Sequence, residues 1–512
     1  MELVTEQNRK RNIVLSLLGS LSSFIISMGI NFFLTPFIVR TLGIEANGFL
    51  GLANNFINYF SLVTIALHSM AGRFITLKIC NNEMEEAGKY FNSLFISNIV
   101  LSIFVFFVSL ACVIRIELLV KVPVDLVMDV KLTFAVTFAN YIIQVLTMVF
   151  SIAFFSTNKL YLQSRRLIQA NLLRVAIILL AFMLFRPKIV YVAIGTIISG
   201  IYILFNDIHY TKKLLPEIKV DRRQFELAKV KELLASGVWN VVAKAGNTLI
   251  TGVDLLISNL FIGATAMGIL AVSKTVPNVM IILIYSVAGV FSPEMTILYG
   301  QGRKYELEKS IKQAMRLLCV FVSIPNGIFI IYGKEFFTLW QPTQDEKLLW
   351  ILSVLAIISM FINGPAMPLE QIFTITNKVY ENSMVVITCS VLSLAATLIL
   401  LKTTSLGLYA IVVVSMAVST LVTLAYRIPR SAVLMGIKWY TFYNEVGINI
   451  ILSILVMVIG FVVKTIIPAH SWSTLIASGG LTVILALILQ WFVLLEKDTR
   501  KLIMQKVRSI PG

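Results

Sequence analysis

Charged side chains are scarce in this sequence. Asp, Glu, Lys and Arg make up only 13% of its 512 residues, whereas 58% are hydrophobic and the mean hydropathy is +0.88. A soluble globular protein has roughly twice that share of charge, and a disordered chain has few apolar residues. The shortage of charge therefore excludes both classes and indicates a polytopic membrane protein.

Cysteine, histidine and enzyme motifs are also rare or missing. The 4 Cys show no CxxC spacing and the 3 His lie far apart, so neither a disulfide framework nor a metal site is expected. The sequence contains no DxD pair, no HExxH and no glycine-rich phosphate loop, which disfavours a membrane-bound polymerase or glycosyltransferase. We expect no enzyme activity and no bound cofactor.

Long apolar stretches are abundant and predict an all-α fold with about 14 transmembrane helices. Each stretch is near the ~20 residues that a helix needs to cross a bilayer core. The predicted spans are residues 13–35, 47–70, 91–114, 131–155, 167–185, 189–206, 234–261, 265–291, 316–333, 348–373, 382–401, 406–426, 444–463 and 474–494.

The distribution of Lys and Arg orients these spans. With the N-terminus inside, 30 of the 43 cations fall in inside segments and 10 in outside segments. This asymmetry is typical of positive cytoplasmic loops, so we expect both termini in the cytoplasm. It explains most of the net charge of +17 without a nucleic-acid partner. The first apolar stretch is too long for a signal peptide and is expected to be a retained helix.

The sequence repeats itself at an offset of 220 residues. Each copy is a short outside turn that enters a helix, where glycine suits a tight turn and close helix packing. Orientation and order agree between the copies, which predicts two parallel repeats of six spans, an arrangement typical of secondary transporters. The identical pairs are Gly43 and Gly263, Ala46 and Ala266, Gly48 and Gly268, Leu50 and Leu270, and Asn58 and Asn278.

The repeat predicts the domain organisation. We expect a six-helix N-terminal lobe at 1–206, a basic cytoplasmic connector at 207–233, a six-helix C-terminal lobe at 234–430, and two extra spans with a basic tail at 431–512. The connector either lies as an amphipathic helix on the anionic membrane surface or forms a solvated loop, and the sequence leaves both open.

Polar side chains recur at helical spacing on several spans, although lipid favours apolar ones. For the serines of the first span (Ser16, Ser20, Ser23 and Ser27), helix packing and cavity lining stay equally open. The fourth span carries a similar stripe of Asn140, Gln144, Thr147 and Ser151. The candidate polar lining of a cavity is Asn31, Asn54, Asn58, Asn240, Asn247, Asp254 and Asn278.

Three cations, Arg174, Lys244 and Lys274, lie within predicted spans, against the anions Asp254 and Glu370. A charge at a helix centre costs ~2.5–3.5 kcal/mol, so Lys244 needs water, an anionic ligand or a partner helix. A wet cavity and a buried pair both stay open, and Arg174 could instead snorkel to the cytoplasmic edge. The positive excess predicts that these three cations bind an anionic substrate head group.

The tenth span contains Pro365 and Pro368 beside a glycine, which predicts a kinked or broken helix. Broken helices often lie at transport gates, but a plain structural kink is the alternative. Within the spans, Asp254 and Glu370 are the candidates for coupling to a proton or sodium gradient, and with the two prolines they form the expected coupling and gating set.

The segment Asn31-Phe32-Phe33-Leu34-Thr35-Pro36-Phe37-Ile38-Val39-Arg40-Thr41-Leu42-Gly43, followed by Asn47-Gly48-Phe49, resembles the Wzx-type polysaccharide-transporter flippases. These belong to the multidrug/oligosaccharidyl-lipid/polysaccharide exporter superfamily. The resemblance covers nearly the whole chain in helix count, repeat arrangement and basic connector. It implies a V-shaped, two-lobed bundle with a central cavity lined by spans 1, 2, 7 and 8.

The resemblance also implies a function. It points to a flippase in the bacterial inner membrane that moves undecaprenyl-diphosphate-linked oligosaccharide, such as O-antigen repeat units in lipopolysaccharide biosynthesis. The implied partners are this lipid-linked substrate, membrane lipids, and the polysaccharide polymerase and chain-length machinery. A lipid II-type flippase and a cation-coupled multidrug exporter of the same superfamily are the alternatives.

Overall fold

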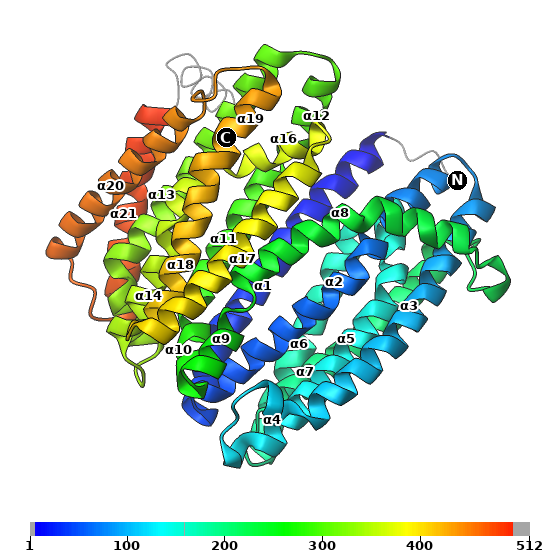
Figure 1. The fold of residues 1–512 in the computed structure, drawn as a ribbon, viewed down its shortest axis with the longest axis horizontal. Coiled ribbons are helices and arrows are strands. Elements are labelled where there is room, and N and C mark those ends of the chain that lie inside the picture. Colours follow the sequence, from blue (N-terminus) through cyan, green and yellow to red (C-terminus); the bar gives the residue numbers. More distant parts are fainter. Residues whose placement is uncertain (1–5, 158, 495–512) are drawn as a thin grey trace. The chain divides into compact units, whose positions relative to one another are not determined.

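The computed structural model describes residues 6–157 and 159–494, and every regular element in these ranges is helical (Figure 1). Thirteen helices in the described ranges are long and apolar enough to cross a membrane. The expectation of an all-α, polytopic membrane protein is therefore confirmed.

The chain divides into two compact units, Met1–Ala271 and Val272–Gly512. The helices that begin in the first unit are α1 (Glu6–Leu42), α2 (Ile44–Cys80), α3 (Met84–Ile114), α4 (Ile116–Leu119), α5 (Val127–Ser156), α6 (Leu160–Leu184), α7 (Val190–Leu214), α8 (Leu227–Thr251), α9 (Asp254–Phe261) and α10 (Ala264–Ser273). This boundary lies beyond the seventh span, whereas the sequence places a lobe boundary before it; the four expected domains stay a prediction.

The second unit holds the remaining helices. They are α11 (Thr275–Gly289), α12 (Ser292–Gly300), α13 (Lys304–Trp340), α14 (Glu346–Ile358), α15 (Met360–Asn363), α16 (Glu370–Ile375), α17 (Val379–Thr403), α18 (Leu408–Val422), α19 (Ile428–Met435), α20 (Tyr443–Ile466) and α21 (Trp472–Leu494). A π-helical turn, Thr423–Arg427, joins α18 to α19. The two C-terminal spans dock on α13, where Tyr332 contacts Gly460 and Thr482, and Gln490 donates to Ser323.

The seventh predicted span, 234–261, differs most from expectation. It is not among the thirteen apolar helices, and it is divided into α8 and α9 at Gly252 and Val253. At this interruption the Gly252 carbonyl accepts hydrogen bonds from the Asn55 amide and the Tyr59 hydroxyl of α2, at 2.8 and 2.7 Å. The seventh span is thus both more polar than the others and interrupted, and hydrogen bonds from α2 stabilise the interruption.

The connector between α7 and α8 forms a short loop, 215–226, with one 3-10 turn at Arg222–Gln224. Asn92 of α3 holds it: its amide donates to the Lys219 carbonyl at 2.9 Å, and its oxygen accepts from the Asp221 backbone at 2.8 Å. The expected connector 207–233 is thus helical at both ends, in α7 up to Leu214 and in α8 from Leu227, with this loop between them. Its location on the membrane surface or in solvent stays a prediction.

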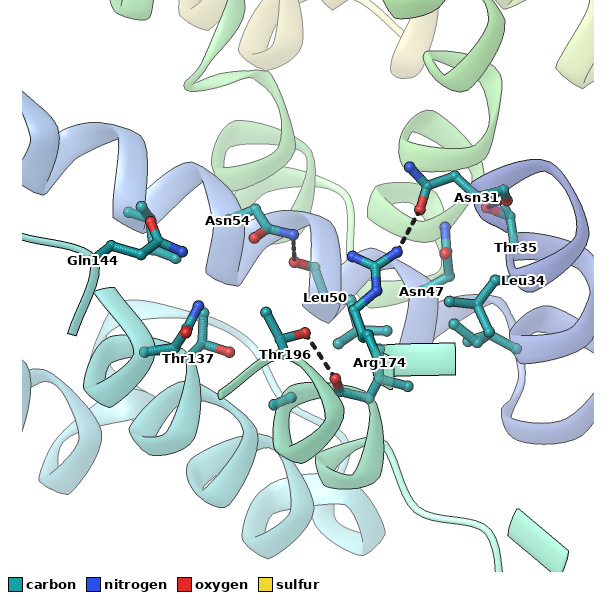
Figure 2. Close-up of a pocket in the computed structure, with 15 residues that line it drawn as sticks. Asn31, Leu34, Thr35, Asn47, Leu50, Asn54, Thr137, Gln144, Arg174 and Thr196 are labelled. Atoms are coloured by element: carbon teal, nitrogen blue, oxygen red, sulfur yellow. Dashed lines mark hydrogen bonds between the residues drawn. The ribbon is translucent and has the colours of Figure 1, made fainter. Parts of the chain in front are cut away.

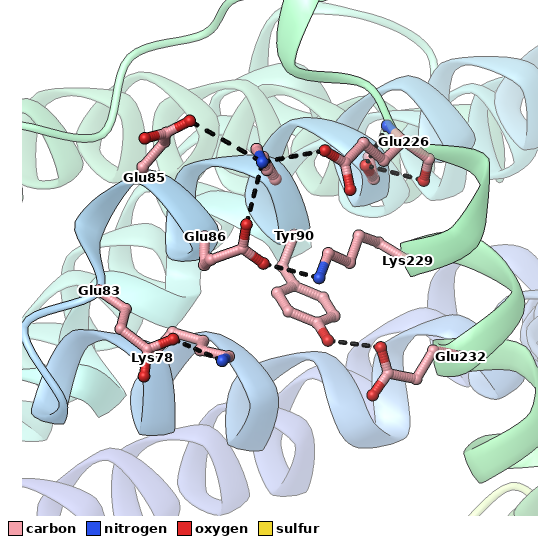
Figure 3. Close-up of polar contacts among 10 residues, drawn as sticks. Lys78, Glu83, Glu85, Glu86, Tyr90, Glu226, Lys229 and Glu232 are labelled. Atoms are coloured by element: carbon pink, nitrogen blue, oxygen red, sulfur yellow. Dashed lines mark hydrogen bonds and ion pairs between the residues drawn. The ribbon is translucent and has the colours of Figure 1, made fainter.

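A charged network joins the start of α8 and the connector to α3 (Figure 3). Lys89 lies 3.0 Å from Glu86 and 3.1 Å from Glu226, while Lys229 lies 2.7 Å from Glu86. The Lys229 ammonium also lies 4.6 Å from the centre of the Tyr90 ring. These contacts explain why α8 belongs to the first unit rather than to the second.

The repeated segments meet each other within the first unit, at equivalent positions of α2 and α10. The Thr265 hydroxyl donates to Glu45 at 2.6 Å, and these two residues are one repeat apart in sequence. A Cβ placed on Gly48 would lie 2.9 Å from the Gly268 Cα, and one on Gly51 would lie 3.6 Å from the Ala271 Cβ. We call these three pairs the repeat seam.

The turns that lead into the seam also match the prediction from the repeat. Gly43 has a φ of 89° and Gly263 a φ of 145°, which is a region that favours glycine. Both glycines immediately precede their helices, α2 and α10. The two copies therefore use the same turn chemistry before the same helix contact.

The tenth span is broken, as its prolines predict. Its helical segments α14 and α15 end at Asn363, and a 3-10 turn at Met367–Leu369 precedes α16. A Cβ on Gly364 would lie 2.5 Å from a Val322 methyl group of α13, so the interruption packs closely against that helix. A gating role for this break stays a prediction.

Candidate functional site: a polar pocket in the first unit

A pocket of about 210 Å³ lies among α1, α2, α5, α6 and α7 (Figure 2). Its polar lining is Asn31, Thr35, Asn47, Asn54, Thr137, Asn140, Gln144, Arg174 and Thr196. Its apolar lining is Leu34, Ile38, Leu50, Ile57, Val192 and Ala193. The lining thus offers five carboxamides, three hydroxyls and one guanidinium, with no carboxylate.

The polar stripe of α1 leads into this pocket along α6. The Asn171 amide of α6 donates to the Ser27 hydroxyl at 2.7 Å, and the Arg174 guanidinium donates to the Asn31 oxygen at 3.1 Å. On each helix the two residues lie about one turn apart, so each helix uses one face. Ser27 therefore serves packing and Asn31 lines the pocket; the side chains of Ser16 and Ser20 lie outside the described residues.

Arg174 contacts the first span. Helix α6 begins at Leu160, seven residues earlier than predicted, so Arg174 lies fourteen residues, or about 21 Å at 1.5 Å per residue, from that end. The side chain meets Asn31 of α1, and its Nε is buried with no hydrogen-bond partner among the described atoms. Snorkelling of Arg174 to the cytoplasmic edge stays a prediction.

Helices α5 and α7 form another wall. Thr137, Asn140 and Gln144 follow helical spacing on α5, and Thr196 comes from α7. Asn140 is 2% exposed, and its oxygen has no hydrogen-bond partner among the described atoms. A Cβ on Gly200 of α7 would overlap this oxygen, so the glycine permits the close approach of the two helices.

One of the three expected cations lines the pocket. Arg174 lines the pocket, whereas neither Lys244 of α8 nor Lys274, which precedes α11 in the second unit, is among the lining residues. Both lysines are half-buried. The prediction that all three cations bind one head group therefore does not describe this pocket, and roles for the two lysines stay predictions.

The pocket lining does not include Asp254, Asn58 or Asn278. Asp254 is buried at the first residue of α9, and Asn58 and Asn278 are exposed. The side chains of Asn240 and Asn247 lie outside the described residues. The roles expected for these five residues stay predictions.

Glu370 has a partner in the second unit. Its carboxylate lies 2.8 Å from the Arg427 guanidinium, which comes from the π-helical turn. A π-turn widens a helix locally and often occurs at functional sites. The pair joins the broken tenth span to the end of α18, so Glu370 remains a candidate for coupling.

Sequence reasoning missed the three threonines of the pocket. Thr137 lies one turn before Asn140 and extends the stripe already seen on the fourth span, so a longer reading of that face would have found it. Thr35 and Thr196 stand among apolar neighbours, and each bonds a carbonyl of its own helix one turn earlier. Such threonines are common in membrane helices and carry no signal of a pocket.

The side chains that line the pocket can bind a polar ligand. Amides and hydroxyls both donate and accept hydrogen bonds, and the guanidinium only donates. In residues 6–157 and 159–494, no group of three or more His, Cys, Asp or Glu is arranged to hold a metal. The arrangement suits recognition of a hydroxylated molecule with at most one negative group.

Comparisons with known proteins show the fold. No protein-family model matches the chain. A Bacillus subtilis (strain 168) protein described as uncharacterized membrane protein EpsK is 27% identical over 498 residues, which are 96% of this chain and 98% of that protein. It leaves the function open.

Several solved structures are similar. An inward-facing multidrug resistance MATE family transporter of the MOP superfamily has a TM-score of 0.64 at 14% identity, covering 83% of this chain and 99% of that one. The MATE multidrug transporter DinF-BH has a TM-score of 0.65 at 14% identity, covering 85% and 99%. A MOP superfamily transporter from Pyrococcus furiosus, described as having a binding pocket of reverse polarity, has a TM-score of 0.61 at 13% identity, covering 82% and 96%. The chain is thus a multi-pass membrane protein with the fold of the MATE transporters of the MOP superfamily.

Proposed function

We propose that the chain is a flippase that moves undecaprenyl-diphosphate-linked oligosaccharide repeat units, such as O-antigen units, across the bacterial inner membrane. The observation that carries this proposal is the pocket among the membrane-spanning helices of the first unit, with nine polar lining residues and no carboxylate. Sugars present many hydroxyls, which need hydrogen-bond partners once they leave water. Carboxamides and hydroxyls supply such partners at depth in the membrane.

The transport step follows from this polarity. The saccharide crosses through the polar interior, while the polyprenyl tail stays in the lipid. Lys244 and Lys274 are candidates to bind the diphosphate by charge-assisted hydrogen bonds. The helix bundle alternates access between the leaflets, with Asp254 or Glu370 coupled to a proton or sodium gradient. Both termini lie in the cytoplasm, and the product passes to a polysaccharide polymerase and chain-length machinery in the same membrane.

Multidrug export, for which the MATE relatives are named, is the main alternative. Arg174 is the charged group of the pocket and repels a cationic drug, and no lining carboxylate attracts one. An exporter of organic cations with this pocket would therefore bind its substrate against the local charge. This polarity favours the flippase over the drug exporter.

The experiment reconstitutes the full chain in proteoliposomes with a fluorescent undecaprenyl-diphosphate-linked oligosaccharide. Movement of the label between leaflets is read by quenching from outside. We expect flipping by the wild-type protein, and no protection of expressing cells against cationic dyes. Dye export without flipping would replace the flippase by the drug exporter.

The pocket itself is tested by a pair of asparagine variants. Asn54→Ala removes a lining carboxamide, and we expect the flipping rate to fall about tenfold, since one lost polar contact costs ~1–2 kcal/mol. Asn444→Ala changes an exposed asparagine near the start of α20, outside the pocket, and serves as the control. Equal rates for the two variants would show that substrate does not use the pocket.

A further inference from the structure

The pocket of the first unit holds one charge. Among its fifteen lining residues Arg174 is the single ionisable side chain that is charged at neutral pH, and the others are carboxamides, threonines or aliphatic groups. A charge within the membrane is stable only when it is paired or hydrated. The hydrogen bond from Arg174 to the neutral Asn31 oxygen satisfies one donor without neutralising the charge.

The Arg174 guanidinium is also oriented so that it can bind a planar anion. Asn31 orients it through one terminal nitrogen, and its Nε–H has no acceptor among the described atoms. An arginine offers a rigid fork of N–H groups that matches a carboxylate with two parallel hydrogen bonds. Figure 2 shows the guanidinium near the carboxamides of Asn31 and Asn47, which are both lining residues of the pocket.

The pocket is small. Its volume of about 210 Å³ is below the roughly 300–1,000 Å³ of a pocket that encloses a whole drug-sized ligand. It therefore fits one ring of a larger molecule. The carboxamides Asn54 and Gln144 line it from two different helices and can bond hydroxyls around such a ring.

The charge of the pocket distinguishes a carboxylate from a diphosphate. Arg174 lies ten residues from the nearer end of α6, which is about 15 Å along the axis. A diphosphate attached to a lipid tail carries more than one negative charge, and a single cation leaves the excess uncompensated away from water. One carboxylate, by contrast, balances one guanidinium.

We propose that this pocket binds one acidic sugar residue of the substrate, a hexose whose C6 is a carboxylate, with that carboxylate on Arg174 and the ring hydroxyls on the carboxamides. The inference rests on the proposed flippase function and names the substrate class of its pocket. It assigns Arg174 to the sugar rather than to the anionic head group expected from the sequence.

The experiment uses a matched pair of probes on the full-length purified protein. Methyl glucuronide and methyl glucoside differ only at C6, which is a carboxylate in the first and a hydroxymethyl group in the second. Binding is measured by titration calorimetry, with acetate as the carboxylate alone. We expect the glucuronide to bind about tenfold or more tighter than the glucoside, because a charge-assisted bidentate pair replaces a neutral hydrogen bond. Acetate should bind weakly, because it lacks the hydroxyls.

Variants of Arg174 identify the partner of the carboxylate. Arg174→Gln should abolish the preference for the glucuronide, and Arg174→Lys should keep only part of it, since lysine lacks the fork. Arg186→Gln alters an exposed arginine between α6 and α7 and should leave the preference unchanged. If the glutamine variant does not fold, the probe pair on wild type and the lysine variant still decide the assignment.

Several outcomes overturn the proposal. Equal binding of the two glycosides removes the acid requirement, and acetate as tight as the glucuronide shows a general anion site. No binding of either glycoside shows that the pocket takes no such sugar. The flipping assay distinguishes failure of this inference from failure of the proposed function. If the protein flips a neutral oligosaccharide and shows no preference for the glucuronide, the flippase function stands and the acidic-sugar site is excluded. If it prefers the glucuronide but flips no lipid-linked oligosaccharide, the flippase function is excluded and the acidic-sugar site stands.

Discussion

Arg174 and Asn31 were both identified from the sequence, but their role in the pocket depends on the contact between them. Hydropathy alone marks Arg174 as a cation inside a span, and helical spacing marks Asn31 as part of a stripe. Their hydrogen bond depends on α1 lying beside α6, which no periodicity within one helix reveals. The chemistry of the two side chains was therefore predictable and their partnership was not.

A second buried arginine gives a prediction of stability. Arg166 of α6 forms an ion pair with Asp207 of α7, and their side chains are 5% and 0% exposed. The Arg166 guanidinium carbon also lies 5.3 Å from the centre of the Phe154 ring. Replacing Asp207→Leu alone should destabilise the protein by about 3–5 kcal/mol, because it leaves a buried cation unpaired. Thermal unfolding of the purified protein, followed by size exclusion, measures the loss.

The double variant Arg166→Met with Asp207→Leu is the control for this pair. It removes both charges and should recover most of the stability, since buried ion pairs often contribute little net free energy. A double variant as unstable as Asp207→Leu would show that packing volume rather than charge pairing controls this site.

Glu117 of α4 makes a pH-dependent contact with Lys131 of α5. The Lys131 ammonium lies 2.7 Å from its carboxylate, and this hydrogen bond holds the pKa of Glu117 below its usual value. A lowered carboxyl pKa stabilises the fold above the unfolded-state pKa, and the contribution is lost as the pH falls through the folded-state pKa. We expect protease cleavage near residues 115–126 to increase only in this acidic range. Lys131→Met should remove the pH dependence.

At the scale of elements, the repeat seam is the contact most open to test. Gly48→Val places side-chain atoms where the Gly268 backbone lies. We therefore expect overpacking to lower the free energy of unfolding by about 1–3 kcal/mol. Gly72→Ala on the same helix has no heavy atom within 4 Å of its new Cβ and is the matched control. That control should be neutral or stabilising, because alanine favours helices by ~1 kcal/mol over glycine. Equal melting temperatures for the two variants would contradict the seam.

Two of the predicted spans, the seventh and the tenth, are interrupted, and only one of these interruptions could be predicted from the sequence. Pro365 and Pro368 predict the interruption of the tenth span because proline cannot continue a helix. The break at Gly252 has no proline, and it coincides with two side chains of α2 that bond its carbonyl. The first break was readable in the sequence, and the second required knowledge of the neighbouring helix.

At the scale of the whole molecule, the scarcity of charge predicted a membrane protein, and the long apolar stretches predicted its all-α fold. The count of spans was less secure, because α8 combines the length of a span with a polar face and falls outside the thirteen apolar helices. The pocket was predicted only in part. Asn31, Asn54 and Arg174 of the expected site line it, and so do Asn140 and Gln144 of the fourth-span stripe. Helical periodicity assigns residues to faces and does not say which faces meet.

Whether α8 crosses the membrane has a direct measurement. In a cysteine-free background, Asp221→Cys lies in the connector before α8 and Ile262→Cys lies just after α9. If α8 and α9 together form the seventh crossing, a membrane-impermeant maleimide added outside intact cells should label only the second site. Arg186→Cys and Asn81→Cys provide the outside and inside controls expected from the Lys and Arg distribution. Labelling of both test sites from one face would show that α8 does not cross.

The repeat seam has one more consequence. A contact between equivalent positions has the symmetry of a homodimer interface, in which each residue would meet its own copy. In a half-length chain that dimerised this way, one substitution would alter both sides of the contact at once. Fusion of two copies in a single chain releases that constraint, and each side can then change alone. Gly48 still faces a glycine, whereas Glu45 faces Thr265 and Gly51 faces Ala271, and at those two positions the copies have become complementary rather than identical.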